Sequence, residues 1–210
     1  KNKLLYWVSA FTKFDEEPFW KGRCIMRIRA ASYNDANTVP QQKQRMKWKI
    51  VSAFIKANRP LIYLGFGAAD HTLTPYNVAL KENLEAFKGE FPEVELDMTK
   101  VALSRGTLSG LENPVMEAAS GSVEITWDPE VNNANSFEDD KLHVSAISED
   151  GDVVLFKGIA SRSEGHASLL IPNSSGKSYD ILAFLTKSGI EKVSTLEQVS
   201  DSQRLGVAIL

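Results

Sequence analysis

The sequence predicts an α+β fold: an N-terminal β-hairpin with antiparallel helices, followed by a C-terminal antiparallel β-sandwich. Three observations predict it. Apolar residues recur at helical spacing between Pro40 and Gly89. Short runs of alternating apolar and polar residues fill the last part of the chain. The turn-rich segment SRGTLSGLENP separates these two regions. We therefore predict a strand and helix assembly domain at 1–110 and a β-sandwich domain at 111–210.

The composition is that of a globular protein. Of the 210 residues, 43% are hydrophobic and 24% are charged, and no apolar run approaches the roughly 20 residues that span a bilayer. We therefore expect no membrane insertion. The single cysteine, Cys24, excludes an internal disulfide and a cysteine-rich metal site.

Charge is distributed unevenly along the chain. Residues 1–50 hold eleven Lys and Arg against four Asp and Glu, which is +7, whereas residues 101–150 hold two against ten, which is −8. The two regions could attract each other within one chain or between successive copies. The simpler interpretation is that each run is a solvated face.

The N-terminal region resembles a hairpin. The runs LLYWVSAF and FWKGRCIMRIRA are rich in β-branched and aromatic residues and flank a charged turn at Asp15–Pro18. In the second run Arg23, Arg27 and Arg29 share one face, which could bind phosphates or an acidic protein surface. An isolated two-stranded hairpin is only marginally stable in water. It therefore has to pack on its own helices or on another subunit.

Residues 30–40 are small and polar and predict a loop. The next segment predicts one helix from Pro40 to about Asn58, because proline is tolerated in a first turn. Pro60 interrupts the apolar pattern, so a short second helix is expected to end at Leu64. Trp48 falls on the polar side of the first helix. It is either an exposed aromatic anchor at a protein interface or is packed under the hairpin.

A further helix begins at Thr74, where Thr is the N-cap and Pro75 the first helical residue. Its apolar face continues to Phe87, and Gly89 suits the position after the helix. Val94, Leu96 and Met98 alternate with polar residues and predict a strand.

The sequence predicts short strands throughout the C-terminal region. A strong hairpin turn is predicted at the Asp-Gly pair of residues 149–152, and a second candidate turn at residues 187–189. Trp127 is expected in the core, and Tyr179 is placed like the tyrosine at a sandwich corner. The predicted strand runs are SVEITW, KLHVSAI, DVVLFKG, HASLLI, SYDILAFLT and EKVSTLEQV.

Two resemblances follow from these motifs. The pattern Ile-Thr-Trp-Asp-Pro, then Tyr-Asp-Ile-Leu-Ala-Phe and Ser-Gly, resembles fibronectin type III-like and immunoglobulin-like sandwiches over residues 115–210. Such domains are mostly spacers and binding modules, and the fold alone does not define chemistry.

A second set of motifs runs along most of the chain. Its residues are Arg27, Arg29, Pro40, Gln44, Arg45, Tyr76, Asn77, Ala79 and Ser104–Leu108. With these motifs the whole chain resembles an uncharacterised bacterial two-domain family whose members share features with proteins of prophage regions. That resemblance implies an assembly or virion-type role. The start KLLYWVSAF departs from the family's glycine-rich pattern.

No catalytic or metal-binding template fits the sequence. His71, His143 and His166 are far apart and have no partner at ligand spacing, and we expect His143 at the surface of a strand. Cys24 is expected to be a buried hydrophobe. The acids at 138–140 lack the spacing of a calcium loop. No catalytic residue, cofactor or metal is therefore predicted.

The leading prediction is a non-enzymatic structural or assembly subunit of a phage virion or extracellular filament. It would be a homo-oligomer, or join other assembly subunits, through its N-terminal region, in a virion or outside the cell rather than in the cytoplasm. The alternatives are a cell-surface or host-binding module using the sandwich loops and, less favoured because the pI is near 5.7, a nucleic-acid-binding accessory protein. The predicted contact residues are Tyr6, Trp7, Phe11, Phe19, Trp20, Arg23, Arg27, Arg29, Arg45 and Trp48.

Overall fold

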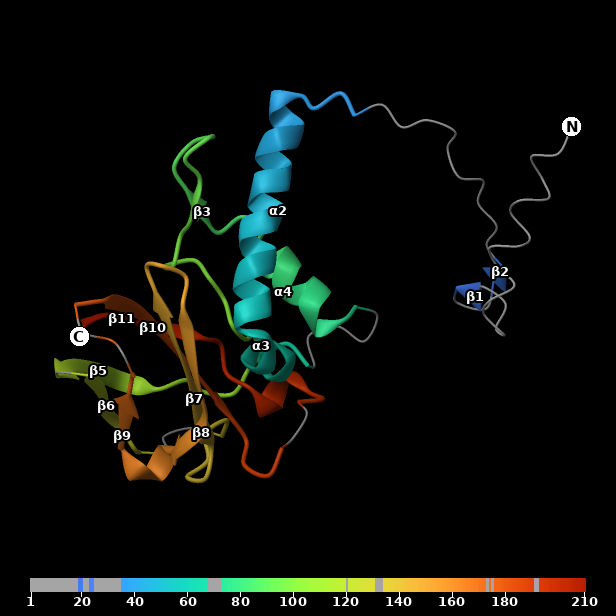
Figure 1. Ribbon diagram of the computed structural model, residues 1–210. Helices are drawn as coiled ribbons and strands as arrows, with labels where there is room; N and C mark the ends of the chain where they lie inside the picture. Colours follow the sequence, from blue (N-terminus) through green and yellow to red (C-terminus); the bar gives the residue numbers. More distant parts are fainter. Residues whose placement is uncertain are drawn as a thin grey trace, which may run out of the picture. The chain divides into compact units, whose positions relative to one another are not determined.

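The computed structural model (Figure 1) forms two compact units, Lys1–Asn37 and Thr38–Leu210. In the first unit, β1 (Phe19–Trp20) pairs antiparallel with β2 (Arg23–Cys24), with Trp20 opposite Arg23. The sequence predicts one strand over residues 19–30, but Phe19–Trp20 and Arg23–Cys24 are two strands that pair with each other. The rest of that predicted strand, to residue 30, lies outside the described residues. The described residues are 19–20, 23–24, 35–67, 73–119, 121–130, 134–172, 174, 176–190 and 193–210.

Two helices follow each other with a one-residue break. Helix α2 spans Val39–Ala57 and α3 spans Arg59–Gly65, as the apolar spacing predicts. The start of α2 is capped by Gln41, whose side-chain oxygen accepts the Thr38 backbone N–H at 3.0 Å. Asn58 closes α2 and precedes α3, whose second residue is proline.

Helix α4, Pro75–Asn83, is shorter than predicted. Its start is confirmed, because Thr74 Oγ1 accepts the backbone N–H of Asn77 at 3.3 Å. The predicted end at Gly89 is wrong. The chain instead forms β3 (Phe87–Lys88), which pairs with β4 (Glu95–Leu96). Gly89 has a φ of +78° and belongs to the turn between these strands.

Seven longer strands form two antiparallel sheets. One has the order β11-β10-β7-β8 and the other β5-β6-β9. Their bounds are β5 Glu112–Ala119, β6 Ser122–Asp128, β7 Lys141–Ser148, β8 Val153–Ser161, β9 His166–Leu170, β10 Ser178–Thr186 and β11 Gln203–Ile209.

Five of the six predicted strand runs are confirmed, from β6 to β10. The turn between β7 and β8 forms at the predicted Asp-Gly pair, where the Gly151 N–H donates to the Ser148 carbonyl. The run EKVSTLEQV is not a strand within its described part. It contains a short 3₁₀ helix, Leu196–Gln198, because the Gln198 side chain accepts the N–H groups of Ser194 and Thr195. Strands β5 and β11 were not predicted.

Strand β10 is buried on both faces and organises the unit. Ile181 and Leu185 point into a core shared with the β5-β6-β9 sheet, and this core includes Trp127, as predicted. Leu182 and Phe184 point into a second core, shared with α2, α3 and α4. The four-stranded sheet therefore lies between the helices on one side and the three-stranded sheet on the other (Figure 1).

Helices and sheet share a core, so the boundary predicted at 110 and 111 falls inside the second compact unit. A polar contact crosses the same interface. The Asn58 side chain accepts a hydrogen bond from Ser145 Oγ of β7 at 2.6 Å and donates to the Phe54 carbonyl. Of the helices in the described residues, none is long and apolar enough to cross a membrane.

Candidate functional site

Two of the predicted contact residues, Arg45 and Trp48, lie on α2 and have described side chains. For three others, Phe19, Trp20 and Arg23, only the backbone of β1 and β2 is described. The remaining ones, Tyr6, Trp7, Phe11, Arg27 and Arg29, lie outside the described residues.

One side of α2 faces away from the core and is basic. Val51 and Ile55 are fully buried toward α4 and the sheet, whereas the Trp48 side chain is 45% exposed. Residues four and seven apart lie on the same side of a helix, so the outward side also includes exposed cationic residues. We call this surface the α2 outer face; it consists of Arg45, Trp48, Lys49 and Lys56.

The rest of α2 reinforces this charge. The helix contains five Lys and Arg residues and no Asp or Glu. The ammonium group of Lys47 lies 4.9 Å from the centre of the Phe87 ring in β3 and is directed away from the outer face. Lys47 therefore lies apart from Arg45, Lys49 and Lys56, which gather on one side.

A second charged surface lies on the three-stranded sheet. Alternation along β6 buries Val123 and Ile125 and leaves Glu124 on the outer side. Glu124 stands opposite Glu117 of β5, and Asp128 stands opposite Glu112. Strands β5, β6 and β9 contain no Lys or Arg.

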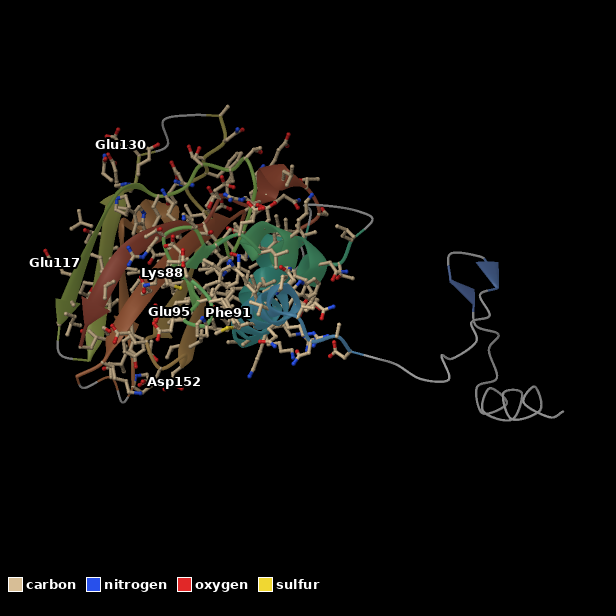
Figure 2. The ribbon with its side chains drawn as sticks, turned by 90° about the horizontal axis from the view of Figure 1, so that it is seen from above. Lys88, Phe91, Glu95, Glu117, Glu130 and Asp152 are labelled. Carbon is tan, nitrogen blue, oxygen red and sulfur yellow. The ribbon has the colours of Figure 1, made fainter. Side chains whose placement is uncertain are left out.

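Apolar side chains are also exposed on this sheet. Val115 of β5 is 54% exposed and Leu170 of β9 is 74% exposed. Figure 2 shows the Glu117 side chain at the margin of the unit away from α2. We call this surface the sheet outer face; it consists of Glu112, Val115, Glu117, Glu124, Thr126, Asp128, Ser168 and Leu170.

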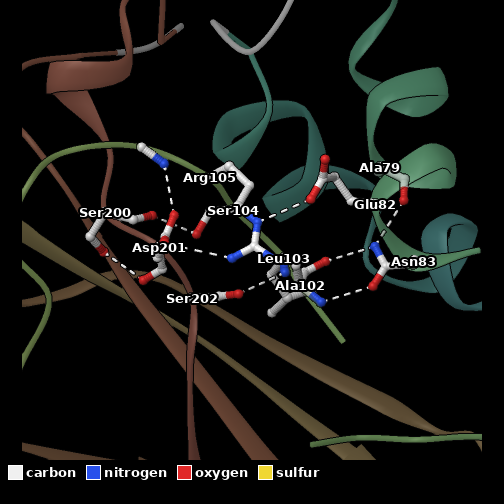
Figure 3. A network of polar contacts seen from close by, with 11 residues as sticks. Ala79, Glu82, Asn83, Ala102, Leu103, Ser104, Arg105, Ser200, Asp201 and Ser202 are labelled. Carbon is white, nitrogen blue, oxygen red and sulfur yellow. Dashed lines mark hydrogen bonds and ion pairs between the residues drawn. The ribbon is translucent and has the colours of Figure 1, made fainter. Parts of the chain in front are cut away.

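The Ser-Arg-Gly-x-Leu segment at 104–108 has a structural role (Figure 3). Ser104 is fully buried and donates to the Ser200 carbonyl at 2.8 Å. Arg105 donates to Glu82 of α4 at 3.1 Å and lies 3.5 Å from Asp201. This segment therefore ties α4 to the residues that precede β11.

The same network fixes the residues just before this segment. Asn83, at the end of α4, donates its side-chain amide to the carbonyls of Ala79 and Ala102 and accepts the N–H of Ala102 (Figure 3). Both polar atoms of this buried amide are thus bonded inside the unit. The network stabilises the fold.

His143 was predicted at the surface, and this prediction is wrong. The side chain is 3% exposed and stacks on Phe184 with ring centres 5.1 Å apart. The helices cover this side of β7, so the ring is enclosed. Burial lowers the pKa of His143 to about 4, and the nearby charge of Lys157 acts in the same direction.

The acidic loop before β7 contains a buried ion pair. Asp140 accepts the Arg162 Nε–H at 3.1 Å, and both side chains are fully buried. Arg162 also donates to the carbonyls of Ser109 and Gly110. Burial raises the pKa of Asp140, although the bonds from Phe137 and Arg162 act against it. Asp140 therefore stabilises the loop through Arg162.

The described residues contain no group of three or more His, Cys, Asp or Glu that could hold a metal ion. His166 is exposed, with its Nδ1 3.0 Å from the Glu164 carbonyl. His71 lies outside the described residues, and of Cys24 only the backbone is described.

The fold and surfaces define a mixed α+β protein with antiparallel sheets, a basic helix face and an acidic sheet face. The chain belongs to the family of unknown function DUF6266, whose model matches residues 16–196. A comparison with curated proteins found no significant match.

Proposed function

We propose that this protein is a non-enzymatic structural subunit that assembles with other copies through the α2 outer face. The observation that carries the proposal is Trp48, a large aromatic side chain that is 45% exposed among cations on a rigid helix. Tryptophan and arginine dominate the binding energy of many protein interfaces. Helix α2 is anchored by Val51, Phe54 and Ile55 in the core, so the outer face is held in a fixed conformation.

The two packed sheets serve as a spacer in this proposal. We assign them to the fibronectin type III-like or immunoglobulin-like sandwiches, supported by two antiparallel sheets that share one core and by buried Trp127 and Tyr179. The assignment to a phage virion or extracellular filament rests on the motif resemblance. The N-terminal strands would add further subunit contacts.

The experiment is sedimentation velocity of the full chain at micromolar concentrations. The wild type is expected to sediment as species larger than a monomer, and Trp48→Ala should shift this distribution to the monomer. Because the Trp48 side chain is 45% exposed, Trp48→Ala should still fold, which unfolding in denaturant checks.

Tyr63→Ala is the matched control. Tyr63 lies on α3, is 41% exposed and contacts Arg59 through its ring, so it is a comparable aromatic residue outside the α2 outer face. Its replacement should leave the sedimentation unchanged. A wild type that is monomeric at every concentration and salt would contradict the proposed function.

Nucleic acid is a second candidate partner, because the five cations of α2 without a carboxylate suit phosphate groups. The net charge of −3 and the acidic sheet outer face oppose it. A gel shift at low salt tests this candidate, since phosphate contacts are strongest there. No shift at low salt would exclude it.

A further inference from the structure

We propose that the partner of the α2 outer face is the sheet outer face of a second copy, so that subunits join head to tail. This inference rests on the proposed function and specifies its interface. The two surfaces carry opposite charges within one compact unit. Of the Asp, Glu, Lys and Arg residues, helix α2 contains only Lys and Arg. Strands β5, β6 and β9 contain only Asp and Glu.

The layer order excludes pairing of these surfaces within one copy. The helices pack on one side of the β11-β10-β7-β8 sheet, and the β5-β6-β9 sheet packs on the other. The helices and the three-stranded sheet therefore lie on opposite sides of the central sheet, as Figures 1 and 2 show. Charges on opposite sides of a packed unit cannot meet. The sheet outer face of a second copy is a surface of opposite charge that the α2 outer face can reach.

The sheet outer face also favours binding a cationic partner. Glu117 stands directly opposite Glu124, and like charges at such positions destabilise a sheet. The Ser168 hydroxyl donates to Glu124 Oε1 and leaves the negative charge in place. Lys49 and Lys56 of a neighbouring copy would remove this repulsion.

Apolar contacts complement the charges. The sheet outer face exposes Val115 and Leu170, and the α2 outer face exposes the Trp48 ring. An exposed leucine at 74% and an aromatic ring at 45% would both lose contact with water in the interface. Each surface therefore combines exposed apolar side chains with charges of one sign. On the sheet outer face, Glu124 lies in the middle, and Val115 and Leu170 lie at opposite corners.

The geometry predicts an open chain of subunits. A closed dimer needs both copies to use the same patch, whereas here the two patches differ and lie on opposite sides. After one contact forms, each end of the pair still presents one unused surface. Further copies can therefore be added along the direction that runs from the helices through both sheets.

Two double variants test this interface. In the helix variant, Lys49→Glu and Lys56→Glu reverse the charge of the α2 outer face. In the sheet variant, Glu117→Lys and Glu124→Lys reverse the sheet outer face. Each alone should raise the dissociation constant for self-association by at least about tenfold, because like charges then meet. All four positions are on the surface of the unit, so each variant should fold.

Mixing the two variants gives the decisive measurement. The helix variant retains a normal sheet outer face, and the sheet variant retains a normal α2 outer face. Neither variant should assemble alone, but together they should form chains of alternating copies, detected by sedimentation, because the native contact joins one pair of faces and the charge-exchanged contact joins the other. A chain carrying all four substitutions should assemble again, because its charges are exchanged. Both associations should weaken at high salt.

Charge-matched controls use exposed positions away from both faces. Lys81→Glu with Lys88→Glu changes the net charge as the helix variant does, and Glu149→Lys with Glu197→Lys matches the sheet variant. Neither control should change assembly. If the wild type assembles but the sheet variant assembles equally well, the head-to-tail interface is wrong and the proposed function survives. If the mixture forms no complex, the inference is also overturned.

Discussion

Nε2 of His143 in β7 lies 2.9 Å from Oγ1 of Thr186 at the end of β10, and both side chains are buried. On its other side, the ring accepts the Gly158 backbone N–H at Nδ1, at 3.1 Å. An amide N–H can only donate, so Nδ1 carries no proton and Nε2–H donates to Thr186. The ring is therefore neutral, and protonation of Nδ1 would break the bond to Gly158.

Acid should destabilise the protein through His143. Its pKa is about 4 in the folded protein and about 6.5 in the unfolded chain, so between these values the unfolded chain binds more protons. The contribution of His143 to the free energy of unfolding is therefore fully present above pH 6.5 and is lost as the pH drops toward 4. At about 1.4 kcal/mol for each pH unit, the loss is roughly 3 kcal/mol.

Urea unfolding at a series of pH values measures this loss. His143→Gln should flatten the pH dependence between about 6.5 and 4, and His166→Gln, at an exposed position, should not. Equal slopes for wild type and His143→Gln would contradict the assignment.

Asn58→Ala should destabilise the interface between the helices and the sheet. The substitution removes the acceptor for Ser145 and leaves a buried hydroxyl unsatisfied, which costs about 1–3 kcal/mol. Adding Ser145→Ala should recover part of this cost. The measurement is the free energy of unfolding in denaturant, with exposed Asn77→Ala as the control. A double variant as unstable as the sum of both single variants would disprove the coupling.

Arg162→Met should be strongly destabilising, because it leaves Asp140 as an unpaired buried charge. Breaking a buried ion pair by removing one partner costs about 3–5 kcal/mol. Asp140→Ala should also destabilise, and the double variant should lose less than the sum. A thermodynamic cycle from denaturant unfolding measures this coupling. Additive losses would show that Asp140 and Arg162 do not act as a pair.

Gly106→Ala should destabilise the junction before β5. An added Cβ would lie 1.8 Å from the Val199 carbonyl oxygen, so the backbone would have to move, at a cost of at least about 2 kcal/mol. Gly189→Ala is the control, since nothing lies within 4 Å and only its positive φ is strained, by about 1 kcal/mol. Thermal unfolding measures the loss of stability of each variant relative to the wild type. Equal losses of stability for the two variants would argue against tight packing at Gly106.

Local pattern predicted most of the secondary structure. Helix α2 could be predicted because its signals are local. Apolar spacing marks its length, and Pro40 and Pro60 mark its two ends. Gly89 misled the prediction of α4, because a glycine with positive φ suits a turn as well as a helix end. Strand β11 was missed because apolar and polar residues do not alternate along it, and Val207 and Ile209 are exposed. Its strand conformation depends on pairing with β10.

The candidate site was only partly predictable. Trp48 was singled out from its place on the polar side of α2, and its side chain is 45% exposed. The sheet outer face was missed, because Glu117 and Glu124 become neighbours only through the register of β5 and β6.

The sequence by itself determined the mixed α+β class, the helix starts and the strands from β6 to β10, because caps, turns and periodicity act locally. Only the tertiary structure decided that His143 is buried and that Arg105 joins α4 to the residues before β11. It also decided that the α2 outer face and the sheet outer face, which carry opposite charges, lie on opposite sides of the unit. These features depend on which elements pack together. A residue's own neighbours in the chain do not specify that.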